Sequence, residues 1–218
     1  MRFEGIEKVW IKLIDTDVQI LPSEDGTVHV YVEPEDAFTL KRDGSTLKVL
    51  TSTGWKLKNL LKKEKERARL SMRIPDDFCI EGSMKRGSLK AKRTRFDSIA
   101  IGEATAELEE CEVKSPSVGP SKVKGSMYIR EEAEVTVSMG NLELKILELG
   151  GDLEVLAVMG SITLKLPEDC DAVIETVQQG GGVVVNSGRL LGSGDHRVKI
   201  SSVKGVVIVD TWGELDEV

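Results

Sequence analysis

Two pairs of aspartates in this 218-residue sequence have the spacing that paired-carboxylate chemistry needs. Asp15 and Asp17 are two residues apart, as are Asp169 and Asp171, and alternate residues of a β-strand lie on one face. Two carboxyl groups that converge in this way can act as acid and base in glycoside hydrolysis. Both pairs lie in predicted turns, however, where aspartate side chains bond to the nearby backbone. We therefore interpret them as turn residues and predict no catalytic residue.

Histidine, cysteine and glycine patterns predict neither a cofactor site nor a metal site. His29 falls within an alternating strand pattern and His196 follows a turn, and neither has other metal ligands close by in the sequence. The glycine run 180–182 lacks the Gly-Lys-Ser/Thr sequence and the following helix that a phosphate loop needs. The cysteines form no Cys-x-x-Cys pair, and we expect buried, reduced side chains. They are Cys79, Cys111 and Cys170.

Charge is the one feature that is distributed unevenly along the chain. Residues 56–95 contain 14 basic and 5 acidic residues, for a net charge of +9, whereas residues 1–55 have a net charge of −4 and residues 96–218 a net charge of −12. A basic segment in an acidic protein is a candidate anion-facing or partner-facing surface. The candidate residues of this basic block are Trp55, Lys56, Lys58, Lys62, Lys63, Lys65, Arg67, Arg69, Lys90, Lys92, Arg93 and Arg95.

Three interpretations of the basic block remain open. It can be a solvated loop, it can be neutralised within the fold or by the acidic surface of a second copy, or it can bind an external polyanion such as nucleic acid or an anionic membrane. The acidic character of the whole chain and its nine aromatic residues favour neutralisation, since few side chains are available to stack bases. We therefore do not expect nucleic acid as a partner, and expect membrane contact to be peripheral at most.

The whole chain reads as short strands separated by glycine and polar turns, which predicts an all-β fold with a single elongated domain over 1–218. In residues 1–80, alternating apolar residues such as Val9, Ile11 and Leu13, together with Asp-Gly turns, predict an antiparallel β segment. This segment is expected to carry a basic loop at 55–66. An acidic tail is expected at 211–218.

From residue 81 to residue 210 a glycine-headed motif recurs, with glycine followed by alternating polar and apolar residues. Its glycines stand at 87, 125, 140, 160, 181 and 205, with spacings of 38, 15, 20, 21 and 24, of which the first is close to two steps of 19. This period predicts a β-solenoid, or β-helix-like, body, in which each glycine relieves crowding at a corner; the alternative is an antiparallel sandwich. We expect Leu142, Leu144, Ile162 and Leu164 to point inward. We expect Glu143, Lys145, Thr163 and Lys165 to point outward.

These motifs resemble a known family. An early "DTDVQI", a strand ending in "RIPDDF", the glycine-headed strands, "MGSITLKLPEDCDAVIET" and a closing "VKGVVIV" are similar to the putative-adhesin β-strand-repeat family of unknown function, from about residue 6 to residue 210. The resemblance implies a solenoid-like β protein. It also implies association with the cell envelope in some bacterial relatives, and it carries over no catalytic residue.

Composition sets the remaining expectations. The N-terminus lacks the apolar core of a signal peptide and no run of 18 apolar residues occurs, so we expect a cytoplasmic protein. A 31% share of charged residues with few amides is typical of a thermophilic source. The predicted function is a non-enzymatic interaction or scaffold module, adhesin-like, with an unknown protein partner or a second copy. The alternatives are a carbohydrate-binding or carbohydrate-active β-helix protein, and a nucleic-acid or anionic-membrane binder using residues 56–95.

Overall fold

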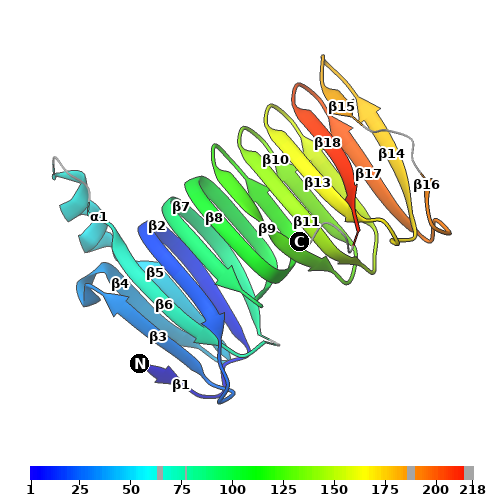
Figure 1. Cartoon of the computed structure of the whole chain (residues 1–218). Coiled ribbons are helices and arrows are strands. Elements are labelled where there is room, and N and C mark those ends of the chain that lie inside the picture. Colours follow the sequence, from blue (N-terminus) through cyan, green and yellow to red (C-terminus); the bar gives the residue numbers. More distant parts are fainter. Residues whose placement is uncertain (63–65, 77, 186–189, 214–218) are drawn as a thin grey trace.

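The computed structural model describes residues 1–62, 66–76, 78–185 and 190–213, and it is an all-β structure (Figure 1). Its strands form one large sheet that is not closed, and one short α-helix and one 3-10 turn accompany them. The helical elements are η1 (Glu35–Ala37) and α1 (Thr53–Leu60). No helix in the described residues is long and apolar enough to cross a membrane.

Within the described residues, eighteen strands make up the sheet. The first six are β1 (Arg2–Phe3), β2 (Lys8–Pro22), β3 (Val28–Glu33), β4 (Phe38–Asp43), β5 (Thr46–Thr51) and β6 (Ala68–Ile74). The next six are β7 (Cys79–Lys92), β8 (Arg95–Val118), β9 (Lys122–Ile129), β10 (Ala133–Val137), β11 (Asn141–Leu149) and β12 (Leu153–Ala157). The last six are β13 (Ser161–Pro167), β14 (Ala172–Gln178), β15 (Val183–Val185), β16 (Leu190–Leu191), β17 (His196–Ser202) and β18 (Val206–Trp212).

From β7 onward, successive segments of the chain lie side by side in parallel. Thr105 of β8 is opposite Lys122 of β9, Lys122 is opposite Asn141 of β11, and Asn141 is opposite Ser161 of β13. The register therefore advances by a nearly constant step from one strand to the next, and this step is close to the spacing of the glycine-headed motif. The only antiparallel pair in this part of the described chain joins β14 to β16, so the antiparallel-sandwich alternative is wrong.

The alternation of side chains follows the predicted register on the inward side. Leu142, Leu144, Ile162 and Leu164 are all buried, as predicted. On the outward side Glu143 and Lys165 are exposed. Thr163 and Lys145 are half-buried rather than exposed. For Lys145 the reason is that its ammonium group lies 3.7 Å from the ring centroid of Trp212.

The repeated glycines do not all have one role. Gly140 and Gly160 lie where adjacent strands enter the sheet, and a Cβ on Gly160 would come within 2.4 Å of the Gly140 carbonyl oxygen. These positions relieve crowding at a corner, as predicted. Gly181 instead lies in a turn with φ +89°, and no atom lies within 4 Å of the position that a Cβ would take, so its role is conformational.

The prediction of a purely antiparallel segment over 1–80 is wrong. β2 is one continuous strand that pairs in parallel with β5 and β6 on one side and with β7 on the other. Among the described residues of this segment, only β1 with β3, β3 with β6, and β4 with β5 are antiparallel. The β4–β5 hairpin does use the predicted turn at Gly44. Alternating residues cannot distinguish the two strand orientations, because both place every second side chain on the same face.

The predicted basic loop at 55–66 begins as helix α1. Ser52 caps this helix, since its hydroxyl accepts a hydrogen bond from the backbone N–H of Trp55 at 3.1 Å. Trp55 is only 5% exposed and belongs to the core, so its assignment to a partner surface is wrong. Leu57 and Leu61 are exposed on the helix and just after it. Lys63 and Lys65 lie outside the described residues, as do residues 214–218 of the predicted acidic tail.

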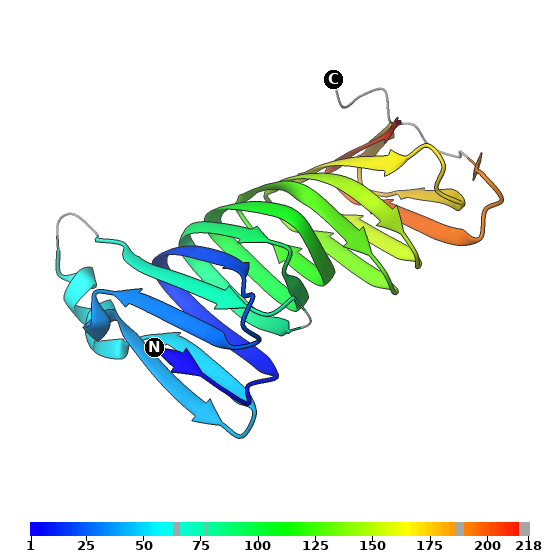
Figure 2. The same ribbon diagram turned by 60° about the horizontal axis from the view of Figure 1, so that its bottom comes forward.

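At both ends of the row of strands, a strand is inserted between two others that are not its neighbours in sequence. The first long strand, β2, lies between β5–β6 and β7, and the last two strands, β17 and β18, lie between β12–β13 and β14–β15. Figure 1 shows the red β18 between the yellow β13 and the golden β15, and Figure 2 shows the whole row of strands from a second direction. The first and the last long strands of the chain, β2 and β18, are therefore interior to the stack rather than at its ends.

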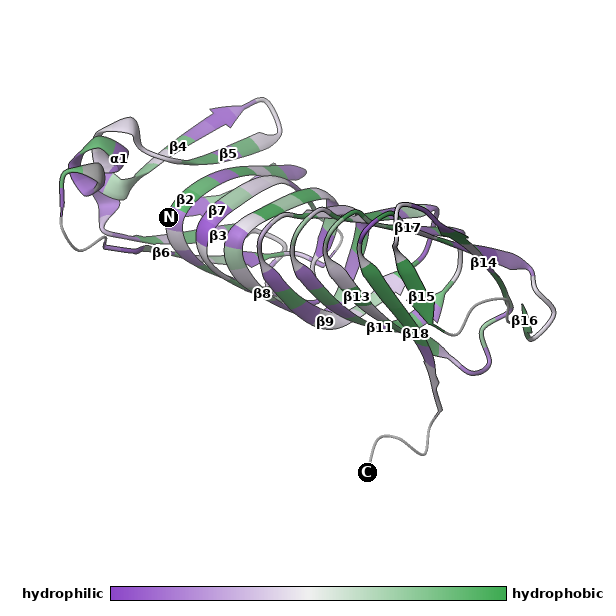
Figure 3. Ribbon diagram, turned by 90° about the horizontal axis from the view of Figure 1, so that it is seen from above, coloured by the Kyte–Doolittle hydropathy of each residue, from purple (hydrophilic) through white to green (hydrophobic). Residues whose placement is uncertain are grey.

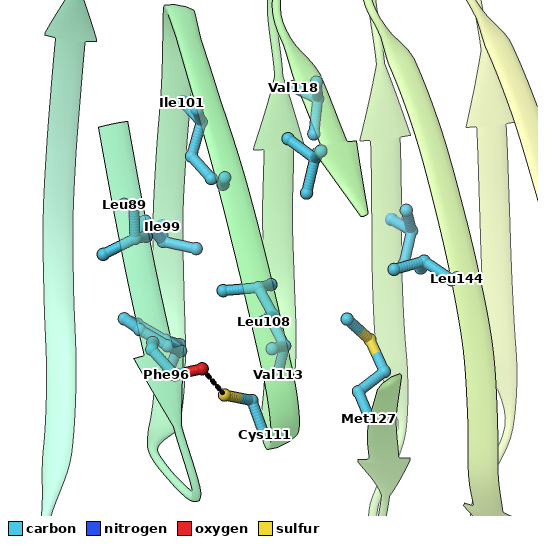
Figure 4. Close-up of a cluster of buried hydrophobic side chains, with 14 of the residues drawn as sticks. Leu89, Phe96, Ile99, Ile101, Leu108, Cys111, Val113, Val118, Met127 and Leu144 are labelled. Atoms are coloured by element: carbon cyan, nitrogen blue, oxygen red, sulfur yellow. Dashed lines mark hydrogen bonds between the residues drawn. The ribbon is translucent and has the colours of Figure 1, made fainter. Parts of the chain in front are cut away.

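The core runs along the whole stack and is almost entirely aliphatic. Its largest fully buried side chain is Phe96, at the start of β8 (Figure 4). Cys111 lies in the same cluster, where its Sγ donates a weak hydrogen bond to the Ala91 carbonyl at 3.5 Å. The three cysteines are free. Burial raises the pKa of the Cys111 thiol to about 11, which keeps it in the unreactive thiol form at neutral pH.

Candidate interaction surface

One face of the sheet runs without interruption across ten strands, and we call it the ten-strand face. One row of outward positions crosses all ten strands in the order β3, β6, β2, β7, β8, β9, β11, β13, β18, β15. Its members are Tyr31, Ser71, Gln19, Lys90, Glu107, Lys124, Glu143, Thr163, Ile208 and Val185. The row changes from charged residues in the middle of the face to apolar residues at the C-terminal end.

The parallel pairing of successive segments explains how the charge that is uneven along the sequence is balanced in the fold. Lys90 of β7 lies opposite Glu107 of β8, and their charged groups are 3.1 Å apart. Lys124 lies on the other side of Glu107 at the same distance of 3.1 Å. Lys85 contacts Glu103 at 3.0 Å in the same way. Basic residues of one segment thus meet carboxylates of the next segment, because parallel stacking aligns them.

Most of the other predicted basic-block residues are also paired. Lys62 contacts Glu66 at 2.7 Å, and Lys92 forms an ion pair with Glu109. Further pairs are Lys58–Asp36 at 3.5 Å, Arg67–Asp17 at 3.2 Å, Arg69–Glu33 at 3.5 Å and Arg95–Glu112 at 3.6 Å. Lys56 and Arg93 form no ion pair with a described residue. The described residues of the block are therefore not brought together as one open cationic site.

Three of the four aspartates in the two sequence pairs are held by structural contacts. Asp15 lies 2.8 Å from Arg86 across the corner between two strands. Asp17 accepts a hydrogen bond from Ser88 at 2.7 Å, and Asp171 accepts one from the backbone N–H of Ser193 at 2.7 Å. His29 of β3 lies 2.8 Å from Asp25 in the turn that precedes this strand. Among the described residues no group of three or more His, Cys, Asp or Glu side chains could hold a metal ion.

Two shallow grooves lie on the ten-strand face. One has a volume of about 650 Å³ and is lined by Lys90, Glu107, Lys124 and Glu143 with their neighbours. The other, of about 600 Å³, lies over β3, β6 and β2 and is lined in part by Tyr31. Both grooves share Gln19 and Lys90. In the first groove Lys90 and Lys124 pair with Glu107, and in the second Arg69 pairs with Glu33, so both walls carry charges of both signs.

At its C-terminal end the ten-strand face becomes apolar. Val183 and Val185 of β15 lie directly opposite Val206 and Ile208 of β18, and these four side chains are 39–49% exposed. Figure 3 shows both strands in green. We call these four residues the apolar block. Sequence reasoning missed it, although the unbroken apolar runs "GVVV" and "GVVIV" depart from strict alternation and could have indicated it.

Trp212, at the end of β18, supplies a hydrogen bond to the sheet that Pro167 cannot donate. Ser161 N–H donates to the Gly140 carbonyl at 2.9 Å, and continuing this pattern places the nitrogen of Pro167 opposite the Ile146 carbonyl. Proline has no N–H to donate. The indole N–H of Trp212, which pairs with Pro167 in the sheet, reaches across and donates to the Ile146 carbonyl at 2.9 Å.

We expect the Trp212→Phe substitution to destabilise the protein by about 1–2 kcal/mol, because the Ile146 carbonyl loses its donor. Adding Pro167→Ala restores a backbone N–H at that position. The double variant should therefore lose less stability than the two single variants together, with a coupling of about 1 kcal/mol. Urea denaturation of all four proteins measures this coupling, and strict additivity would contradict the assignment.

The pairing of Glu107 also predicts a pH dependence. Hydrogen bonds from Lys90 and Lys124 lower the pKa of Glu107 below its ordinary value. A carboxyl group with a lowered folded-state pKa stabilises the fold above its unfolded pKa of about 4.3 and loses this effect as the pH falls. Glu107→Gln should therefore be less stable than the parent at pH 7, and the difference should shrink below about pH 4. Glu24→Gln, in an exposed turn, is the control, and a difference independent of pH would contradict the prediction.

The ion pairs further predict that the parent protein is not retained on heparin at about 0.15 M salt, because polyanion binding needs unpaired cations. Glu107→Lys should increase retention, since it unpairs Lys90 and Lys124 and adds a cation between them. Glu134→Lys makes the same change of charge away from the basic block and should increase retention less. Strong, salt-sensitive retention of the parent would show that the block binds external polyanions.

Comparison with known proteins finds no matching family model and no matching curated protein. Two solved structures are similar to this chain. A putative cell adhesion protein from Clostridium sporogenes has 13% identity and a TM-score of 0.40, with 95% of this chain and 94% of the other covered. A putative adhesin from Bacteroides fragilis has 13% identity and a TM-score of 0.45, with 97% and 95% covered.

Proposed function

We propose that the protein is a non-enzymatic, adhesin-like interaction scaffold that is built as a β-solenoid and uses the ten-strand face for contact. The solenoid interpretation is supported by the parallel register, which advances by a nearly constant step from β8 through β13. The observation that carries the functional proposal is the change along this face from self-paired charges to the apolar block. Exposed apolar patches of this kind are typical of contact sites.

The proposed occupant of the apolar block is a second copy of the chain. The block contains no charged side chain, so a partner surface must be apolar, and an identical block related by a two-fold axis is self-complementary. The rest of the face, with its rows of lysine and glutamate, is less suited to cover it. A stable interface buries about 800 Å² per partner. Four partly exposed aliphatic side chains cover only part of that area, so the association should be weak and concentration-dependent.

Sedimentation equilibrium over a wide concentration range tests this proposal. The average molar mass of the parent should rise toward that of a dimer, and Val185→Lys/Ile208→Lys should remain monomeric at the same concentrations. The control, Ser71→Lys/Thr105→Lys, adds the same charge on β6 and β8 of the same face, away from the apolar block, and should associate like the parent. A parent that stays monomeric throughout, or a block variant that associates as well as the parent, would overturn the proposal.

A further inference from the structure

Four strands at the C-terminal end, β14, β15, β17 and β18, are not stacked in sequence order. β17 lies between β12 and β14, so that Leu156 is opposite Ser201 and Ser201 is opposite Val177. β18 lies in the same way between β13 and β15. In sequence order, β14 would lie directly on β12, and β17 would lie outside it. In both arrangements β14 is a neighbour of β17. The two orders differ in which of these two strands pairs with β12.

Chain length does not decide between these two orders. In the observed stack Thr136 of β10 is opposite Leu156 of β12, which gives the length of one sequential step. The length of chain from Leu156 to Val177 is nearly the same. The chain between β12 and β14 is thus long enough for direct stacking, yet β14 stands one strand farther away. Something other than loop length must favour insertion of β17.

Charge distinguishes the two orders. The strands β10, β12, β17 and β14 are not part of the ten-strand face, and they carry an outward row of their own. In spatial order this row contains Glu134, Glu154, Lys199 and Glu175. Lys199 lies 2.6 Å from Glu154. If β14 lay directly on β12, Glu154 would be opposite Glu175, and three carboxylates would follow one another in adjacent strands. Like charges directly opposite each other destabilise a sheet.

We infer that Lys199 selects the strand order at the C-terminal end of the stack by separating Glu154 from Glu175. Arg197, two residues earlier on the same strand, supports the same order from both sides. Its backbone N–H donates to Asp152 on the β12 side at 2.9 Å, and its Nε donates to Glu175 of β14 at 2.8 Å. β17 therefore joins two acidic neighbours that would otherwise face each other.

Burial of the core is the competing cause. The inward residues Val198 and Ile200 of β17 are fully buried between two neighbouring strands. In the same inward column as Ile200, β14 carries Thr176, which is half-buried. An apolar strand in the interior and a more polar strand at the end would also favour the observed order. The experiment must therefore change the charge without changing the core.

Disulfide trapping reports the strand order directly. In a background with Cys79→Ser, Cys111→Ala and Cys170→Ala, one protein carries Leu156→Cys/Ser201→Cys and a second carries Leu156→Cys/Val177→Cys. Adjacent strands are about 4.8 Å apart, and a disulfide needs Cα atoms about 4.4–6.8 Å apart. The first pair can therefore close only in the observed order. The second pair can close only if β14 lies directly on β12.

With Lys199 present, the first pair should close and the second should not. Lys199→Glu should raise the ratio of second-pair to first-pair disulfide about tenfold, because two attractive cross-strand pairs become repulsive. Lys165→Glu, the same substitution on β13, should leave the ratio unchanged. If Lys199→Glu fails to fold, Lys199→Gln replaces it, and Glu154→Lys/Lys199→Glu/Glu175→Lys should restore the observed order. Complete first-pair closure in the Lys199 variants, with no second-pair disulfide, would show that core burial sets the order and would overturn the inference.

Discussion

Replacement of Phe96 by alanine is expected to lower the free energy of unfolding by about 3–5 kcal/mol. Phe96 is 0% exposed and is the largest fully buried side chain. It packs at the start of β8, where the register with β7 shifts between Ile80 and Glu81, and Figure 4 shows Ile99 and Val113 among its neighbours. The surrounding residues belong to strands that are fixed on both sides, so they cannot collapse into the cavity. Urea denaturation measures the loss.

Phe3→Ala is the matched control for this prediction. Phe3 is only partly buried and lies on β1, a two-residue strand at the edge of the sheet. It should therefore cost clearly less than Phe96→Ala. Equal effects of the two substitutions, or a loss below about 1 kcal/mol for Phe96→Ala, would be incompatible with one continuous core along the stack.

Gly160→Ala should be nearly as damaging and is expected to cost about 3 kcal/mol or more. The added Cβ would lie 2.4 Å from the Gly140 carbonyl oxygen and 2.5 Å from a methyl group of Val137. The first of these atoms belongs to the backbone of the adjacent strand. Relief would require the two strands to separate, which would weaken the hydrogen bond from Ser161 N–H to Gly140.

Gly102→Ala provides the comparison for Gly160→Ala. Gly102 lies within β8, but a Cβ there would meet no atom within 4 Å, and its φ is not in the left-handed region. This substitution should be neutral or slightly stabilising. Both variants are compared by thermal and urea unfolding. If alanine were tolerated equally at the two positions, the close strand approach at Gly160 would not exist in solution.

Much of the fold follows from local sequence pattern. Alternation fixes which residues face the core, and it identified Leu142, Leu144, Ile162 and Leu164 as buried. The glycine spacing indicated the register step, because the same corner recurs each time the chain reaches an adjacent strand. These features depend on residues that are close in sequence, or separated by one repeat, and for this reason a single sequence reveals them.

The strand order could not be predicted in the same way. Insertion of β2 beside β7, and of β17 beside β12, pairs segments that are far apart in the sequence. Alternation is identical in parallel and antiparallel strands, so it led to a wrong antiparallel interpretation of residues 1–80. The burial of Trp55 was missed because the basic residues that follow it in the sequence suggested a surface position.

The candidate surface was only partly visible in the sequence. The segregated charge of residues 56–95 drew attention to the basic block, but the partners of Lys90 and Lys124 become apparent only when the register places Glu107 between them. The apolar block went unnoticed because β16 and β17 separate its two strands, β15 and β18, in the sequence. Their pairing turns two short apolar runs into one exposed patch.

Methyl NMR spectra recorded as a function of protein concentration test the central claim most directly, namely that the apolar block is the contact surface between two copies. We predict that concentration-dependent shifts concentrate on the methyl groups of Val183, Val185, Val206 and Ile208, and that these shifts disappear in Val185→Lys/Ile208→Lys. Methyl groups of Leu57 and Leu61, which are exposed at the other end of the stack, should not shift. Shifts centred on those two leucines, or spectra that do not change with concentration, would contradict the claim.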